Sequence, residues 1–222
     1  MQHHDNNEIT TSEIKKEFQL ERMILFSDAV FAIVITLMAI EIRVPETEGK
    51  LVIDELPKVL LHLLPVIFAY IVSFIFIGAI WYQHLRIFSL LKDYDKGLVI
   101  RNLLLLFFIG LFPFSASLIT RAKGAMIAFF MYMGIIMLCV TAQYLLYHYI
   151  VVKRPVLRVD ADIQEHLIEL RKRKISLIGF ASASILITIT YILIPQPEMK
   201  SMSVLWMAFF PIVYRILTKK KK

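Results

Sequence analysis

The sequence predicts an all-α, polytopic membrane protein with six transmembrane helices, and its composition and charge pattern point to this class. Of its 222 residues, 58% are hydrophobic, and the mean hydropathy is +0.68. Only 19% are charged, against about 25% in a typical soluble domain. The charged residues gather in short clusters that separate long apolar runs, which is typical of polytopic membrane proteins.

The first apolar run covers about residues 22–42 and is long enough to cross a membrane. About 20 helical residues, at about 1.5 Å each, span a hydrocarbon core of about 30 Å. Arg43, Pro45 and Gly49 end the run. The preceding residues 1–20 are polar and mixed in charge, so we expect a disordered N-terminal tail that leads into an amphipathic helical turn.

Five further apolar segments follow. Pro113 lies near the end of the third segment and predicts a short, kinked helix there. The polar stretch 153–174 has helical spacing after Asp160. The second to sixth segments cover about residues 57–82 (continuing as a helix to 91), 98–118, 125–152, 175–194 and 201–217. We therefore expect one membrane domain, residues 21–218, between an N-terminal tail, residues 1–20, and a basic C-terminal tail, residues 219–222.

Basic residues are distributed unevenly between the two sides of this arrangement. With six spans both termini lie on one side, and that side receives 19 of the 25 lysine and arginine residues. Cytoplasmic loops carry the excess of Lys and Arg in membrane proteins. The sequence thus predicts a multi-pass protein of the cell membrane with both termini in the cytoplasm.

Polar groups cluster at the cytoplasmic end of the first three segments. Asp28 lies about one turn inside an apolar run, where an ionisable group needs a partner or water. Residues of the second and third segments reach the same depth, so we expect a structural network between helices. Alternatively, each of these residues, considered by itself, is an ordinary residue of the membrane–water interface. The expected members are Arg22, Phe26, Ser27, Asp28, Trp81, His84 and Asn102.

The outer half of the first segment carries an aliphatic stripe. Ile33, Thr36, Leu37 and Ile40 are spaced i, i+3, i+4 and i+7, which places them on one helix face. Such a stripe commonly faces lipid or a neighbouring helix. Alternatively it lines a pore, with the aliphatic residues as hydrophobic constrictions that gate by dewetting. Glu41 would then lie at the outer mouth and concentrate cations.

A family resemblance appears in the first three segments. Arg22-x-x-x-Phe26-Ser27-Asp28 resembles the R-x-x-x-F-S-D signature of the transmembrane protein 175 family of potassium channels. The neighbouring motifs are similar too: a threonine, a glutamate and a proline in the first segment, a tryptophan and a histidine three apart in the second, and an asparagine and a Pro-aromatic pair in the third. These residues are Thr36, Glu41, Pro45, Trp81, His84, Asn102, Pro113 and Phe114.

The resemblance implies a fold and a function. Members of the bacterial type have one six-helix unit per chain and form homotetramers, in which the first helix of each subunit lines the pore. Residues matching Ile33, Leu37 and Ile40 form the pore and gate, and the residue matching Thr36 contributes to selectivity. The expected function is therefore passive, potassium-selective conduction without a T-V-G-Y-G filter. Ala39 makes the outer helix slimmer than a run of bulky aliphatic residues would.

Other functions remain open from the residues alone. Asp28 and His84 are titratable groups at one depth, so a proton channel or proton-coupled transporter is the alternative. A membrane enzyme is disfavoured because H-E-x-x-H, G-x-S-x-G and glycine-rich phosphate motifs are lacking. We expect no catalytic residues, no metal site, no cofactor beyond the permeant potassium ion, and no nucleic-acid partner. The partners expected are the lipid bilayer, potassium ions and further copies of the chain.

Overall fold

The computed structural model describes residues 2–40, 42, 56–121, 126–159 and 163–194. Within these residues the regular structure is helical, and five helical stretches are long and apolar enough to cross a membrane. The predicted class of all-α polytopic membrane protein is therefore confirmed. Three predicted features lie outside the described residues: the sixth segment, the basic tail of residues 219–222, and Glu41.

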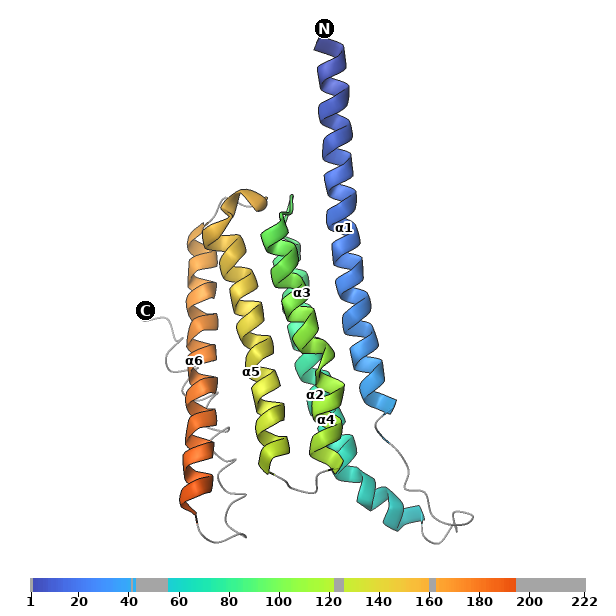
Figure 1. Cartoon of the computed structure of the whole chain (residues 1–222), viewed down its shortest axis with the longest axis vertical. Helices are drawn as coiled ribbons and strands as arrows, with labels where there is room; N and C mark the ends of the chain where they lie inside the picture. Colours follow the sequence, from blue (N-terminus) through green and yellow to red (C-terminus); the bar gives the residue numbers. More distant parts are fainter. Residues whose placement is uncertain (1, 41, 43–55, 122–125, 160–162, 195–222) are drawn as a thin grey trace.

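Helix α1 (Gln2–Ile40) runs without interruption from the N-terminal region through the first membrane segment (Figure 1). The predicted disorder of residues 1–20 is therefore wrong for residues 2–20. The sequence between residues 2 and 40 contains no glycine or proline to stop a helix. Contacts to the next connection also hold it: Lys16 forms an ion pair of 3.3 Å with Asp93, and Gln19 accepts a hydrogen bond from Tyr94.

The third membrane segment is broken in two, as its proline predicts. Helix α2 (Leu56–Phe88) leads through a short connection to α3 (Lys96–Gly110), and α4 (Phe112–Arg121) completes the span. Pro113 has no N–H, and its ring excludes the carbonyl four residues earlier. The backbone tightens at the break, where the Leu111 N–H donates to the Phe108 carbonyl (3.2 Å). The predicted kink is confirmed.

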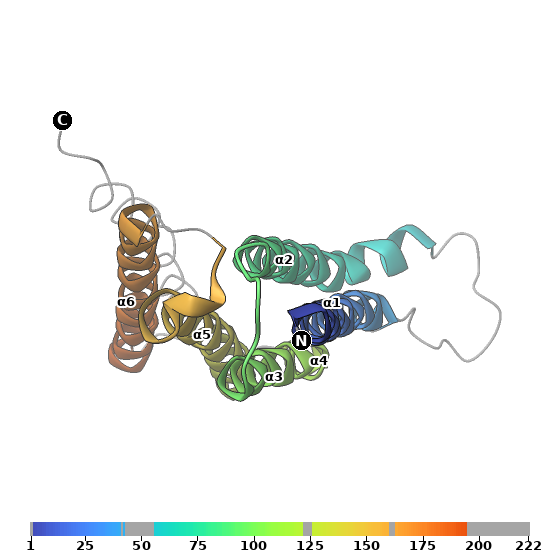
Figure 2. The ribbon, with the colours of Figure 1, turned by 90° about the horizontal axis from the view of Figure 1, so that it is seen from above.

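The remaining described chain forms two long helices. Helix α5 (Met126–His148) ends in a π-helical turn η2 (Tyr149–Lys153) and a 3₁₀ turn η3 (Pro155–Leu157). Helix α6 (Ile163–Leu193) begins in the charged stretch, as the helical spacing after Asp160 predicts, and continues through the fifth apolar segment. In Figure 2, α1 and α6 lie at opposite sides of the bundle, with α5 beside α6.

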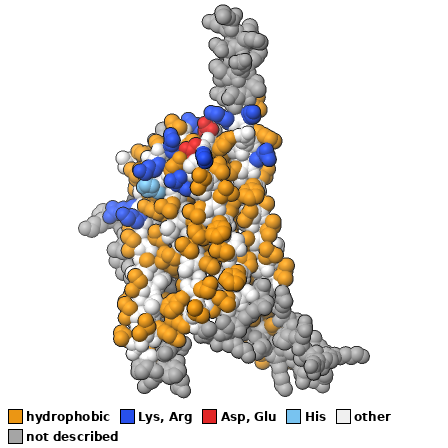
Figure 3. All heavy atoms as spheres, in the orientation of Figure 1, with side chains coloured by type: hydrophobic (Ala, Val, Ile, Leu, Met, Phe, Trp, Pro, Cys, Tyr) orange, Lys and Arg blue, Asp and Glu red, His pale blue; other side chains and the backbone are white. Residues whose placement is uncertain are grey.

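One end of the bundle collects the charged groups. The α2–α3 and α5–α6 connections both lie at the end from which the N-terminal half of α1 projects (Figure 1). Lys and Arg side chains gather there above a hydrophobic band (Figure 3). The two connections are paired, because Val159 N donates to Leu90 O (2.8 Å) and Lys92 N donates to Leu157 O (2.9 Å). This end is called the charged end below.

Candidate functional site

Helix α1 has two contrasting faces within the membrane segment. Phe31, Val34 and Met38 are at most 4% exposed and pack into the bundle core. Ile33, Leu37 and Ile40 are at least 45% exposed and point away from the subunit. Because a lone helix face of this kind is covered by something outside the subunit, the outward stripe is the candidate contact surface for a pore or for lipid.

A buried hydrogen-bond chain anchors the inward face of α1. The Asn102 amide Nδ2 donates to Ser27 Oγ (2.8 Å), and Ser27 Oγ donates in turn to the Met23 carbonyl (2.8 Å). The Asn102 Oδ1 faces His84 Nε2 at 2.9 Å, which assigns the imidazole proton to Nε2. Ser27, His84 and Asn102 are at most 1% exposed. One amide on α3 therefore links α1 to α2.

Aromatic rings enclose the histidine of this chain. The imidazole of His84 stacks on Phe88, with ring centroids 4.0 Å apart and an interplanar angle of 23°. Phe31 of α1 lies against the same imidazole at 5.5 Å. These rings leave His84 no exposure to solvent, so the side chain is held for packing and hydrogen bonding.

Asp28 makes a separate link nearer the surface. Its Oδ1 accepts a hydrogen bond of 2.9 Å from the indole Nε1–H of Trp81 on α2. Asp28 is partly buried and Trp81 is partly exposed. The carboxylate that stands inside the apolar run is thus paired across the α1–α2 interface, which lowers the cost of placing it there.

Arg22 and Phe26 lie apart from this network. Both are exposed, and no hydrogen bond or ion pair joins them to the network in the part of the chain that the structure describes. Counting along α1, residues 22, 26, 29, 33, 37 and 40 follow each other at steps of three or four, so Arg22 and Phe26 extend the outward stripe. The R-x-x-x-F-S-D motif therefore serves two opposite helix faces.

Thr36 lies on the outward face and presents oxygen lone pairs. Its hydroxyl donates back to the carbonyls of Ala32 (3.0 Å) and Ile33 (2.9 Å) on its own helix. Because the single hydroxyl proton is used within the helix, the outward side of Oγ1 is an acceptor. An acceptor between aliphatic neighbours is suited to a passing cation rather than to an anion.

The chain is similar to a family model, to several named potassium channels and to a solved channel structure. The family model described as the endosomal/lysosomal potassium channel TMEM175 matches residues 22–113. A potassium channel from Streptomyces collinus is 36% identical over 104 residues (45% of this chain, 47% of the relative), and one from Chryseobacterium sp. is 35% identical over 104 residues (47% and 50%). The crystal structure of a lysosomal potassium-selective channel TMEM175 homolog from Chamaesiphon minutus superposes with a TM-score of 0.62 at 25% identity, over 91% of this chain and 100% of that chain.

Residues 22–113 of the chain are therefore similar to the TMEM175 family, and its fold resembles that of a TMEM175 homolog. This is a family of ion channels and not of enzymes. The chain spans about half the length of the curated relatives it matches. The stretch matched by the TMEM175 model includes the residues of the buried network and the whole outward stripe. The structural similarity extends over the rest of the TMEM175-like bundle.

Further polar contacts hold the bundle in places that the sequence reasoning missed. Gln143 of α5 donates to the Ile80 carbonyl of α2 (2.9 Å), and Ser73 of α2 shares a hydrogen bond of 2.7 Å with Tyr132 of α5. All four positions are buried or partly buried. A glutamine and a serine inside apolar runs were the available signal, because polar side chains there need partners.

A second missed cluster lies at the charged end. Asp95 caps α3 by accepting from Leu98 N (2.7 Å), and its other oxygen accepts from Tyr149 Oη (2.8 Å). Arg154 lies 3.3 Å from the same oxygen. The guanidinium of Arg101 lies over the Tyr149 ring at 3.9 Å. The cluster ties α3 to the end of α5.

Proposed function

We propose that the chain is a subunit of a potassium channel whose pore is lined by α1. The observation that carries the proposal is the two-faced character of α1: hydrogen bonds and core packing anchor one face, while Ile33, Thr36, Leu37 and Ile40 point out of the subunit. Relatives of about 35% identity bear the name potassium channel. A helix fixed from behind can present such a stripe to a central pathway without moving.

The proposed assembly is a homotetramer in which four copies of the stripe face one axis. Ile33, Leu37 and Ile40 form the hydrophobic constriction, which gates by dewetting. Thr36 supplies hydroxyl oxygens within it, and Glu41 stands at the outer mouth. Arg22 and Phe26 continue the outward face of α1, so their partners in this proposal belong to neighbouring subunits.

The proposed orientation places the charged end in the cytoplasm of a cell with the protein in its plasma membrane. The connections at that end carry many of the lysine and arginine residues (Figure 3). Loops rich in Lys and Arg remain on the cytoplasmic side during insertion. In this orientation the N-terminus is cytoplasmic, and with a sixth span the C-terminus is too.

The test is an ion-flux assay on Ile33→Asn in liposomes, compared with Ile75→Asn. The Trp81–Asp28 hydrogen bond sets α1 and α2 at a common level. Ile33 lies five residues beyond Asp28, about 7.5 Å further into the membrane. Helix α2 runs in the opposite direction, so a similar depth is reached about five residues before Trp81, where Ile75 is exposed. We expect Ile33→Asn to raise potassium flux or weaken potassium over sodium preference, because an amide wets the constriction. Ile75→Asn is expected to conduct as the parent does.

Proton flux measured in the same liposomes distinguishes a potassium channel from the alternative function. A proton channel or proton-coupled transporter would show pH-driven proton flux with no requirement for potassium. Equal effects of Ile33→Asn and Ile75→Asn would contradict the assignment of the outward stripe to a pore.

A further inference from the structure

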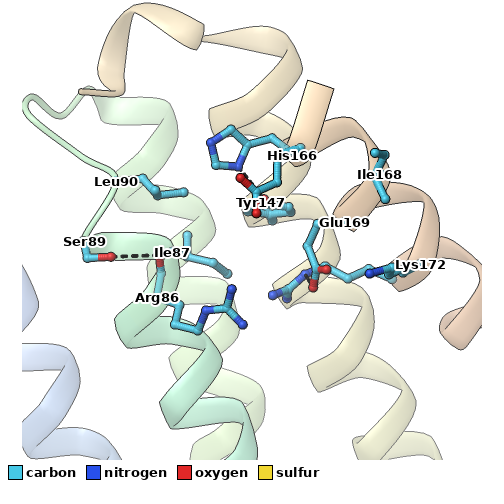
Figure 4. Close-up of a pocket in the computed structure, with 11 residues that line it drawn as sticks. Arg86, Ile87, Ser89, Leu90, Tyr147, His166, Ile168, Glu169 and Lys172 are labelled. Atoms are coloured by element: carbon cyan, nitrogen blue, oxygen red, sulfur yellow. Dashed lines mark hydrogen bonds and ion pairs between the residues drawn. The ribbon is translucent and has the colours of Figure 1, made fainter. Parts of the chain in front are cut away.

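A cavity opens at the charged end where α2, α5 and α6 meet. Its volume is about 290 Å³, which is at the lower end of the range of ligand pockets (about 300–1,000 Å³). Figure 4 shows Arg86 of α2 and Glu169 of α6 on opposite sides of it, with Tyr147 of α5 between them. The cavity is far from the outward face of α1, because α1 and α6 lie at opposite sides of the bundle (Figure 2).

The lining of the cavity has more positive than negative side chains, and one of the negative side chains already forms an ion pair. Arg86, Lys172 and Arg173 face two acids, Glu165 and Glu169. Glu169 is paired with Arg173, whose Nε lies 3.4 Å from Glu169 Oε1. Arg86 is exposed and has no ion pair with another described residue. A basic group in this cavity is thus available to a ligand.

The orientation of Arg173 is fixed by three partners. Besides Glu169, its Nη1 donates to Gln83 Oε1 (2.8 Å), and its guanidinium lies over the ring of Tyr147, 4.7 Å from the centroid. Arg86 and Arg173 both line the cavity, and each carries a positive charge. Two guanidinium groups held close together gain most from an anion between them.

Arg158 is a further buried arginine at the charged end, outside the lining of the cavity. Its residue is only 5% exposed, and its Nε and Nη1 have no hydrogen-bond partner among the described residues. Its backbone is fixed by the bridge to Leu91. Buried donors without acceptors are costly, so an acceptor at the charged end would also stabilise this side chain.

We propose that this cavity binds a phosphate group, held by Arg86 and Arg173. Guanidinium groups match the geometry of phosphate oxygens and form strong, charge-assisted hydrogen bonds with them. The cavity lies between membrane helices at the basic end of the bundle, a setting in which proteins bind the headgroups of anionic lipids. The phosphate belongs either to such a headgroup or to a soluble phosphate compound.

The test is ligand-dependent thermal unfolding of the full-length protein in an uncharged detergent. The probes are inorganic phosphate, short-chain phosphatidylglycerol and, as the zwitterionic comparison, short-chain phosphatidylcholine. We expect the midpoint to rise with phosphate or phosphatidylglycerol and the affinity to fall by about tenfold or more in Arg86→Gln, because one charge-assisted contact is lost. The matched control is Arg171→Gln, which removes an exposed charge of α6 outside the cavity.

The outcomes distinguish a lipid headgroup from a soluble phosphate compound, and they also test whether the site exists. A rise with phosphatidylglycerol alone supports a lipid headgroup, and a rise with inorganic phosphate supports a soluble phosphate compound. No rise with either probe, or equal losses in Arg86→Gln and Arg171→Gln, would overturn the site. The readout is binding, so it is independent of whether the chain conducts potassium.

Discussion

Replacing Asn102 by leucine removes the side chain that joins three helices. The amide is 1% exposed, donates to Ser27 and accepts from His84. Without it, the Nε2–H of His84 stays buried and unpaired, which costs about 1–3 kcal/mol. Ser27 still donates to the Met23 carbonyl. Losing the hydrogen bond that Ser27 accepts from Asn102 therefore costs only as much as an ordinary interhelical hydrogen bond, about 0.6 kcal/mol. We expect a total destabilisation of about 1.6–3.6 kcal/mol.

Equilibrium unfolding in mixed detergent micelles, followed by circular dichroism, measures this loss. The matched control is Tyr132→Phe, which deletes another buried interhelical bond. Its partner Ser73 keeps a hydrogen bond to the Ala69 carbonyl, so the expected cost is only about 0.6 kcal/mol.

A double variant isolates the unpaired histidine. Adding His84→Phe to Asn102→Leu removes the orphaned donor and places a ring between Phe31 and Phe88. The double variant should recover about 1 kcal/mol relative to additivity, because neither partner is then unsatisfied. Strict additivity, or a cost for Asn102→Leu no larger than that of Tyr132→Phe, would refute the reasoning.

Two further predictions concern other contacts of the bundle. Trp81→Phe removes the indole hydrogen bond to α1 and should lower the unfolding free energy by about 1–2 kcal/mol in the same micelle assay. Tyr82→Phe, at an exposed neighbour, should leave it unchanged. At Gly97 an added Cβ would collide with the Tyr149 hydroxyl, so Gly97→Ala should destabilise by about 1–3 kcal/mol. Gly78→Ala, where a Cβ meets open space, should be neutral or stabilising, and equal thermal midpoints for the two alanine variants would contradict this.

The depth of the polar side chains in the membrane could be predicted from the sequence, whereas their hydrogen-bond partners could not. Ser27, Asp28, Trp81, His84 and Asn102 were expected at one level because apolar runs have a fixed rise per residue. Which of them bond to which depends on helix rotation and on the neighbouring side chains. The structure pairs Asp28 with Trp81 and leaves Arg22 on the opposite face of α1.

The helix boundaries show what composition alone does not determine. Residues 2–20 are polar, and polarity favoured disorder, but contacts of Lys16 and Gln19 with the α2–α3 connection support the helix. The charged turns of α6 are likewise bound to α5, because Tyr147 of α5 contacts His166 and Arg173 of α6. These are tertiary contacts between distant segments, and no local pattern encodes them. Pro113, by contrast, acts locally, and its kink was predictable.

Cysteine accessibility tests the central claim that the outward stripe of α1 lines the ion pathway. The single native cysteine, Cys139, is fully buried, so new cysteines can be added without removing it. Leu37→Cys and the control Ile75→Cys, at an exposed position of α2, are placed in liposomes, and potassium flux is measured before and after addition of silver ions. We predict that silver abolishes flux through Leu37→Cys and spares Ile75→Cys and the parent protein. Unchanged flux through Leu37→Cys, or equal block of both variants, would contradict the assignment of α1 as the pore helix.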